Sequence, residues 1–581
     1  MNSDNISPAE WRWVAIFSGF LVTLTLLPYA WALAASDDVY NFMGVLPNPK
    51  DGATYISKIQ QGVDGSWLFE LRHTPQIHEP AGFHLFYLML GHIARPLGLS
   101  NVVIFHLARV ATSFFMFFAL YQLGATIWPR TRPRRWFFML ISAGSGLGWL
   151  GLVISRGTAF APDLFVAEAF PLLAAYTNPH FPLSIGCLAL LAAEMYRVLR
   201  PDYHDAPTPE NGGLVVVLLS VVLAIVSPPA LLVIGSVLVS YTVVRAYASR
   251  SLPLHEARWV SLVVLPGFPF AAYYYAVFRF NDVMREFNEQ NITSSPNIIL
   301  FILGFGLILV IALPEIIFAF RHFERDGDQL MLTWLVVNSI AVYIPFFALQ
   351  RRLFIGLIIP LTYFAVRSLV SYWSNRVPEK WQAPALIALA VFMVPTHVLT
   401  FFAPLAFAVI NRDGGAETGI LLATDYLSAF HWLEENSQIN EVLLAAPSVG
   451  LWTPAETHLR PYYGHEFETI PAEPRLAEVR AFYRGEDCDT PFDPDLPFRV
   501  QYVFWGPREN DMGVIDAEKD DIDEIIRDDL DEFNFPDEEG VVQEPPLQRL
   551  PDADKCKEYL EERAAEQMEF GDVTLYILKT P

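Results

Sequence analysis

Long apolar runs dominate this 581-residue sequence. A run of about 17 or more mostly apolar residues is long enough to cross a hydrocarbon core of roughly 30 Å as an α-helix. Ten such runs lie at residues 11–33, 102–128, 136–154, 181–199, 229–247, 258–278, 297–320, 329–349, 353–373 and 383–410. A shorter run at 213–226 precedes Ser227-Pro228-Pro229, which breaks a helix but need not prevent spanning. The sequence therefore predicts a polytopic α-helical membrane protein with about eleven transmembrane helices.

Charge is distributed very unevenly along the chain. Residues 1–410 carry 25 lysines and arginines against 23 acidic residues, whereas residues 411–581 carry 14 against 40. The net charge of −24 thus comes almost entirely from the tail. Because binding to phosphate backbones needs clustered lysine and arginine, we exclude nucleic acid as a partner.

Basic residues predict the orientation in a bacterial plasma (inner) membrane. The run at 11–33 is longer than the core of a cleavable signal and is interpreted as a retained first helix. Residues 129–135 form the densest cationic connection, and the other basic turns alternate consistently with it. We therefore expect a cytoplasmic N-terminus, a transmembrane domain at 1–410 whose first outer loop spans 34–101, and an extracytoplasmic tail at 411–581.

The acidic tail has the pattern of a soluble α/β domain. Residues 427–436 have helical spacing, and residues 501–505 and 573–578 resemble buried strands. The acidic stretch 511–539 is interpreted as a solvated insertion, with a calcium site as the less favoured alternative. In an exported tail Cys488 and Cys556 could form a disulfide, and two unpaired thiols are an equally open alternative.

Two adjacent carboxylates, Asp37 and Asp38, directly follow the first predicted helix. Such a pair at the membrane surface could deprotonate an acceptor hydroxyl, or could share a divalent cation that holds a phosphate. The alternative is an ordinary polar helix terminus. No other cofactor is indicated.

Further polar candidates lie in the first outer loop. Asp51 could cap a helix over 51–61, and His78 and Glu79 could bind sugar hydroxyls or form a solvated pair. The apolar stretch 83–97 contains two histidines and an arginine, so we expect an interfacial or re-entrant helix there rather than a span.

Three more candidates follow later in the chain. His180 lies at the mouth of a predicted span, where it could contact a ligand or simply sit in the interface. Arg351 and Arg352 occupy a predicted outer turn, on the side where basic residues are rare. Because arginine binds phosphate bidentately, these two residues could bind a lipid phosphate, with snorkelling toward anionic headgroups as the alternative.

Motifs of several large classes are missing from the sequence. It has no P-loop, His-Glu-x-x-His, Gly-x-Ser-x-Gly or paired Cys-x-x-Cys, and its one Gly-x-Gly-x-x-Gly, at residues 146–151, lies inside the predicted transmembrane run 136–154 and not after a strand. This argues against an ATP-driven pump, a dinucleotide enzyme, a zinc protease and a serine hydrolase.

The arrangement resembles the GT-C superfamily of integral-membrane glycosyltransferases. The resemblance is carried by the acidic pair after the first helix and by short motifs along most of the chain. These motifs are Asp51-Gly-Ala-Thr-Tyr55, His78-Glu79-Pro80, Asn178-Pro-His-Phe-Pro-Leu183, Gln350-Arg-Arg-Leu-Phe354, His431-Trp-Leu-Glu-Glu-Asn436, Pro461-Tyr-Tyr-Gly-His465 and Tyr502-Val-Phe-Trp-Gly-Pro-Arg-Glu509. The tail motifs resemble a little-studied bacterial branch of that superfamily.

The resemblance implies inverting transfer of a sugar from a polyprenyl-phosphate donor to an extracytoplasmic acceptor. It implies that Asp38 or Asp37 is the base and that Arg351 and Arg352 bind the donor phosphate. It also implies substrate contacts from the loop residues and His180, namely Asp51, Tyr55, His78, Glu79 and His180. The sequence departs from the superfamily in lacking the usual acidic-x-acidic pair in the first loop.

Two alternatives remain open at this point. One is a non-catalytic membrane scaffold whose acidic tail binds a protein partner. The other is a transporter, which the sequence favours less because its spans contain few charged residues.

Overall fold

The computed structural model describes residues 6–199, 212–323, 327–345, 347–515 and 548–579. Within these residues the chain forms two compact units. Unit 1 comprises residues 1–35, 44–69 and 80–410, and unit 2 comprises residues 36–43, 70–79 and 411–581. Most of the acidic stretch 511–539, which the sequence predicts to be a solvated insertion, lies outside the described residues.

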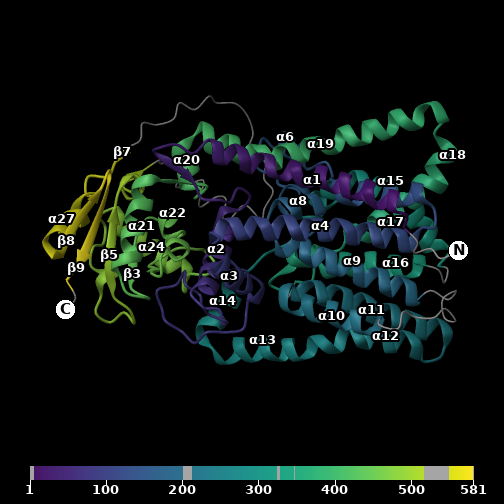
Figure 1. Ribbon diagram of the computed structural model, residues 1–581, viewed down its shortest axis with the longest axis horizontal. Coiled ribbons are helices and arrows are strands. Elements are labelled where there is room, and N and C mark those ends of the chain that lie inside the picture. Colours follow the sequence, from purple (N-terminus) through teal and green to yellow (C-terminus); the bar gives the residue numbers. More distant parts are fainter. Residues whose placement is uncertain (1–5, 200–211, 324–326, 346, 516–547, 580–581) are drawn as a thin grey trace. The chain divides into compact units, whose positions relative to one another are not determined.

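Unit 1 is helical throughout. Its elements are α1 (Pro8–Ala34), α2 (Pro49–Val63), α3 (Leu85–Leu97), α4 (Asn101–Ile127), α5 (Thr131–Ala143), α6 (Gly148–Ile154), α7 (Pro162–Phe165), α8 (Pro171–Tyr176), α9 (His180–Leu199), α10 (Gly212–Val226), α11 (Pro228–Ser249), α12 (Leu254–Val264), η2 (Leu265–Gly267), α13 (Phe268–Phe280), α14 (Asp282–Gln290), α15 (Ile298–Arg321), α16 (Gly327–Ala341), η3 (Gln350–Phe354), α17 (Ile358–Ser368), η4 (Leu369–Trp373), α18 (Ser374–Arg376) and α19 (Glu379–Ile410). The long helices α1, α4 and α9 run side by side, with α4 packed between the other two (Figure 1).

Nine helical segments among the described residues are long and apolar enough to cross a membrane. They account for nine of the eleven predicted spans, so the multi-pass membrane architecture is confirmed. The two differences are at 213–226 and 329–349. The first forms α10, an apolar helix of only 15 residues, and in the second α16 stops at Ala341 and the chain continues in turns.

The loop between α1 and α4 also follows the sequence expectation in part. The stretch predicted as an interfacial or re-entrant helix forms α3, a 13-residue helix that is not among the candidate spans. The predicted helix after Asp51 is α2, but its N-cap is Asn48, whose side chain accepts a hydrogen bond from the Asp51 N–H. Asp51 thus lies in the first helical turn, where its negative charge interacts favourably with the helix dipole.

Unit 2 is the expected α/β domain. Its elements are β1 (Tyr40–Phe42), α20 (Arg412–Glu417), β2 (Leu421–Ala423), α21 (Thr424–Asn436), β3 (Val442–Leu444), α22 (Pro447–Gly450), α23 (Thr453–Glu456), β4 (Arg460–Pro461), α24 (Ala472–Tyr483), η5 (Thr490–Phe492), β5 (Val500–Trp505), α25 (Pro507–Met512), β6 (Val514–Ile515), β7 (Gln548–Arg549), α27 (Lys555–Arg563), β8 (Ala564–Phe570) and β9 (Val573–Leu578). The predicted helix at 427–436 and both predicted strands are present.

The core of unit 2 is a five-stranded mixed sheet in the order β4-β3-β5-β9-β8. Strands β4, β3 and β5 are parallel, whereas β9 pairs antiparallel with β5 and β8. Buried aromatic and aliphatic side chains from α24, β5 and α27 form one hydrophobic cluster with the sheet. Cys488 and Cys556 form a disulfide inside this cluster, which settles the pairing that the sequence left open.

Two pieces of the loop between α1 and α4, residues 36–43 and 70–79, are integral parts of unit 2. Strand β1 pairs antiparallel with β2, with Tyr40 opposite Ala423 and Phe42 opposite Leu421. Residues 70–79 pack into the same unit. The expected boundary after residue 410 is therefore only one of several points at which the chain passes between the units.

Candidate functional site

The acidic pair after α1 lies in unit 2, and its two members have different environments. The Asp37 carboxylate accepts hydrogen bonds from the N–H groups of Val39 and Tyr40, at 2.9 and 2.8 Å, and pairs with Arg412. The Tyr40 N–H, Arg412 and the Val39 N–H together lower the pKa of Asp37 to about 2. Asp38 is exposed and has no hydrogen-bond or ion-pair partner among the described residues. Asp38 is therefore the more available carboxylate of the pair.

The other first-loop pair, also in unit 2, is occupied by local contacts. His78 Nε2 accepts from the Leu71 N–H at 3.0 Å, and Nδ1 lies 2.9 Å from the Glu79 carbonyl oxygen. Since an amide can only donate and a carbonyl can only accept, His78 is neutral with its proton on Nδ1. Burial lowers the pKa of His78, which agrees with this state. These bonds give His78 a structural role in the loop, and the Glu79 side chain is exposed.

In unit 1 the crossing of α2 and α3 sets the position of two tyrosines. The helices meet at Gly62 and Gly91, where a Cβ on either residue would lie 2.1 Å from a backbone oxygen of the other helix. One to two turns before this contact, Tyr55 of α2 stacks on Tyr87 of α3, with ring centroids 4.4 Å apart and planes at 15°. The close crossing therefore brings the two rings together.

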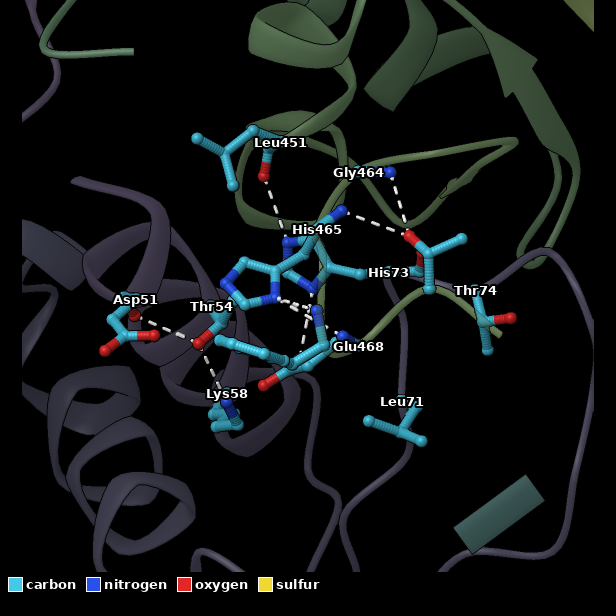
Figure 2. A network of polar contacts seen from close by, with 12 residues as sticks. Asp51, Thr54, Lys58, Leu71, His73, Thr74, Leu451, Gly464, His465 and Glu468 are labelled. Carbon is cyan, nitrogen blue, oxygen red and sulfur yellow. Dashed lines mark hydrogen bonds and ion pairs between the residues drawn. The ribbon is translucent and has the colours of Figure 1, made fainter. Parts of the chain in front are cut away.

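Helix α2 presents a polar stripe on the face that carries Tyr55. Asp51, Tyr55 and Lys58 are spaced so that they lie on the same side of the helix. Lys58 is buried, donates to Thr54 Oγ1 at 2.9 Å and lies 4.9 Å from the Tyr55 ring centroid. The link from Lys58 through Thr54 to the Asp51 carbonyl can be followed in Figure 2.

His180, the first residue of α9, joins this aromatic group. Its Nδ1 lies 2.6 Å from the Tyr87 hydroxyl, and its ring centroid is 5.1 Å from that of Tyr55. Arg109 helps to set the position of this helix start, because its fully buried guanidinium donates to the carbonyl groups of Ala175 and Tyr176, at the end of α8.

Arg352 provides a second cation beside this group. Its Nη1 lies 2.5 Å from Glu168 Oε1, and its guanidinium lies 5.8 Å from the ring centroid of Phe181. Glu168 is almost fully buried, whereas about a quarter of the Arg352 side chain is exposed. The Asp51 carboxylate is close enough to act electrostatically on both Arg352 and His180.

Arg351 lies beside this cluster in the chain but is oriented by different contacts. Its backbone N–H donates to the Thr293 carbonyl at 3.0 Å, and its guanidinium lies 5.5 Å from the Phe165 ring centroid. The two arginines therefore have different neighbours, and Arg352 is the one whose ion pair with Glu168 is described.

The structure thus brings four of the predicted site residues together in unit 1. They are Asp51, Tyr55, His180 and Arg352, and we call them, with Tyr87, Lys58 and Glu168, the polar cluster. Asp37, Asp38, His78 and Glu79 belong to unit 2.

Sequence reasoning did not select Tyr87, Lys58 or Arg109 as site residues. Lys58 could have been found from its spacing to Asp51, and Arg109 from its place as a lone arginine inside an apolar run.

Unit 2 contains a second buried polar network, which the sequence did not indicate. His73 contacts the Leu451 carbonyl oxygen through Nε2 at 3.0 Å and Glu468 through Nδ1 at 3.3 Å (Figure 2). Nearby, His465 Nδ1 accepts from the N–H groups of Phe467 and Glu468. These contacts join the loop after β4 to residues 70–79. Among the residues described in either unit, no group of three His, Cys, Asp or Glu side chains is placed to hold a metal ion.

These features define a multi-pass membrane protein with a helical bundle, a loop-borne polar cluster and an α/β unit. No protein-family model and no curated protein matches the chain. Among solved structures it is similar to an Archaeoglobus fulgidus oligosaccharyltransferase tethered with an acceptor peptide, at 11% identity and a TM-score of 0.48, covering 84% of this chain and 69% of that one. It is also similar to apo ArnT from Cupriavidus metallidurans, at 14% identity and a TM-score of 0.49, covering 86% and 94%.

With identities of 11% and 14% and TM-scores below 0.5, the similarity carries no argument about this chain. It assigns no activity, ligand or residue role to this chain.

Proposed function

We propose that the protein is a membrane glycosyltransferase that transfers a sugar from a polyprenyl-phosphate donor to an extracytoplasmic acceptor. In this reaction the bond between the sugar C1 and the phosphate oxygen breaks. A bond forms from the acceptor oxygen to C1, and polyprenyl phosphate leaves. The acceptor's proton passes to a carboxylate base of the protein.

The observation that carries the proposal is the composition of the polar cluster in unit 1. A partly exposed guanidinium, that of Arg352, lies within the electrostatic influence of Asp51 and next to the Tyr55, Tyr87 and His180 rings. A cation for phosphate, a carboxylate and an aromatic surface are the groups that transfer from a sugar phosphate needs. His180 and Arg352 lie at the starts of two candidate spans, where a lipid-linked donor would have access.

The arginines are assigned to the donor phosphate. A guanidinium has five N–H donors, and only Nη1 of Arg352 is bonded to Glu168 among the contacts described, so other donors can bind phosphate oxygens. Arg351 supplies a second positive charge from the adjacent position. Glu168 holds Arg352 in place, because a buried carboxylate strongly favours a nearby guanidinium.

The base is assigned to one of three carboxylates. Asp38 is exposed and lacks a described partner, whereas the hydrogen bonds and ion pair of Asp37 make it a poor proton acceptor. Asp51 is the candidate within the polar cluster itself. We therefore rank Asp38 and Asp51 above Asp37. A divalent cation is not required by this assignment.

The test is sugar transfer by the full chain in proteoliposomes, with polyprenyl-phosphate sugars as donors. We expect release of polyprenyl phosphate by the wild type and a loss of about 100-fold or more in Arg352→Gln and in the variant of the true base, Asp38→Asn or Asp51→Asn. Matched controls are Arg95→Gln, an exposed arginine of α3, and Asp64→Asn, at the far end of α2.

Undiminished turnover in Arg352→Gln, Asp38→Asn and Asp51→Asn would remove these residues from the mechanism. If no donor supports transfer while the protein remains folded, the non-catalytic scaffold is the better description. The partner search for a scaffold must then use the full chain, since residues 411–581 alone lack two segments of unit 2.

A further inference from the structure

The contact between Tyr87 and His180 is the shortest side-chain hydrogen bond within the polar cluster apart from the Arg352 ion pair. It joins the hydroxyl on α3 to Nδ1 of the first residue of α9 at 2.6 Å. The Tyr87 ring is fixed by stacking on Tyr55 and is almost fully buried. A buried hydroxyl held this rigidly can set the orientation of its partner ring.

Tyr87 is a neutral phenol in this bond. Burial raises the pKa of Tyr87 well above its usual value, and the neighbouring Tyr55 and Asp51 raise it further, so the hydroxyl keeps its proton. A protonated phenol next to an imidazole nitrogen donates to it when that nitrogen carries no proton. In the Nε2–H tautomer of His180, Nδ1 is then the acceptor.

The charges around His180 favour its neutral form. Arg352 and Lys58 are positive and act on the imidazole directly, as does His84 when protonated. Asp51 is the one opposing charge among the groups that act on it most strongly. With two permanent cations against one carboxylate, a third positive charge on the imidazole is unfavourable.

A neutral imidazole that accepts at Nδ1 carries its proton on Nε2. Nε2 has no hydrogen-bond partner among the described residues, and the side chain is partly exposed. In this tautomer His180 offers one oriented N–H donor to a neighbouring ligand. Phe181, the next residue, lies under the Arg352 guanidinium, so this donor and that cation come from neighbouring positions.

We infer that Tyr87 is a positioning residue, which holds His180 as a neutral imidazole whose Nε2–H donates to an oxygen of the donor's phosphate group. The inference rests on the proposed function for the identity of the ligand. The arrangement of Tyr87 and His180 stands on the geometry alone. A neutral donor beside Arg352 adds a directed hydrogen bond without adding charge, which orients the phosphate rather than merely attracting it.

The experiment reads the tautomer directly. Full-length protein labelled with ¹⁵N-histidine is placed in nanodiscs, and the His180 signals are identified by their absence in His180→Gln. We expect the Nε2–H tautomer in the wild type and a mixture of tautomers in Tyr87→Phe. Addition of polyprenyl phosphate is expected to shift the Nε2 signal in the wild type. Tyr274→Phe, which removes a hydroxyl that donates to the Ala224 carbonyl, is the matched control.

Kinetics provide the second measurement. Tyr87→Phe is expected to lower turnover about tenfold, the effect of losing one oriented hydrogen bond. His180→Gln keeps an N–H donor near the position of Nε2 and is expected to retain part of the activity. In that background Tyr87→Phe should have no further effect, because there is no imidazole left to orient. Additive losses would mean that Tyr87 acts only through packing and would overturn the inference.

The two proposals can fail separately. An Nδ1–H or charged His180 in the wild type overturns the positioning role even if sugar transfer is observed. A wild-type signal that does not respond to polyprenyl phosphate overturns the phosphate contact. Absence of transfer together with a clear phosphate-induced shift overturns the proposed reaction and supports the inferred contact.

Discussion

Glu70 and Arg460 form an ion pair in unit 2 across 390 residues of sequence, with Oε2 and Nη2 2.7 Å apart. Arg460 has no exposed surface, and its Nη1 also donates to the carbonyl groups of Leu71 and Thr74. A loop between two transmembrane helices thus supplies partners for a buried cation in the C-terminal domain. Residues 70–79 are for this reason a structural part of unit 2 and not simply a connection.

Arg460→Ala is expected to destabilise unit 2 by about 3–5 kcal/mol, because it leaves a carboxylate and several carbonyl groups without their buried donor. Thermal unfolding followed by tryptophan fluorescence is a suitable measurement, since Trp452 is fully buried in this unit. Lys555→Ala, at an exposed lysine of α27, should change the stability by less than about 0.5 kcal/mol. Equal effects of the two substitutions would show that the buried pair is not important for stability.

The disulfide between Cys488 and Cys556 closes a loop with a sequence separation of 68 residues. Restricting the unfolded chain over such a loop stabilises a domain by about 4 kcal/mol. Cys488→Ser is therefore expected to lower the unfolding temperature of unit 2, and a reductant should lower that of the wild type but not of the variant. Cys187→Ser is the control, because that cysteine is free and buried. A bond formed in cells would also support the extracytoplasmic placement of the tail, since disulfides persist in oxidising compartments.

The sequence predicted the spans well, because lipid requires long apolar helices whatever the tertiary structure. It failed at 329–349, where hydropathy continues but the helix does not. There Thr293 donates to the Ala348 carbonyl and its own carbonyl accepts from the Arg351 N–H, while Ser295 donates its N–H to the Gln350 side chain. These residues, distant in sequence, form hydrogen bonds with backbone and side-chain groups of residues 348–351, beyond the end of α16. The local sequence pattern does not reveal such distant partners.

The candidate site was predictable only in its parts. His180 and Arg352 were selected as polar residues at the ends of apolar runs, and Asp51 was selected as a candidate helix cap in the first loop. Their proximity depends on the α2–α3 crossing and on the buried partners Glu168 and Arg109, which are set by tertiary packing. The roles of Asp37 and His78 within unit 2 depend likewise on Arg412 and on the Leu71 N–H, which only the folded chain brings near.

Asp163 is a buried carboxylate of unit 1 that bridges a break between α5 and α6. Its Oδ2 accepts from the N–H groups of Gly146 and Gly148 at 3.0 and 3.1 Å, and from Thr396 Oγ1 at 3.1 Å. No cation pairs with it among the described residues, and only 1% of it is exposed. Burial raises the pKa of Asp163 to about 7.

This raised pKa predicts a loss of stability with rising pH. Between about pH 4 and 7 the folded protein keeps a proton that the unfolded chain releases, so the free energy of unfolding falls as the pH rises and levels off above pH 7. The total change is on the order of 4 kcal/mol. Asp163→Asn should remove this slope and be more stable than the wild type above pH 7. Unfolding of the detergent-solubilised protein at several pH values is the measurement, and an unchanged slope in the variant would rule out Asp163 as its source.

The crossing of α2 and α3 gives the last prediction, because it links packing to the polar cluster. A methyl group at Gly62 would lie 2.1 Å from the Leu88 carbonyl oxygen, and one at Gly91 would lie 2.1 Å from that of Ile59. Backbone atoms cannot move aside as a flexible side chain can, so Gly62→Ala should force the helices apart. The cost is about 1–3 kcal/mol, and Tyr55 would be drawn away from Tyr87.

The separation should also reduce transfer, since Tyr87 then orients His180 less well. Gly19→Ala is the matched control, because a methyl group on that residue of α1 meets nothing within 4 Å. Thermal stability and turnover are measured together in both variants. Because helix separation disturbs the tyrosine pair directly, turnover of Gly62→Ala should stay low even at temperatures where the protein is fully folded. Full activity under those conditions would show that the close crossing serves stability alone.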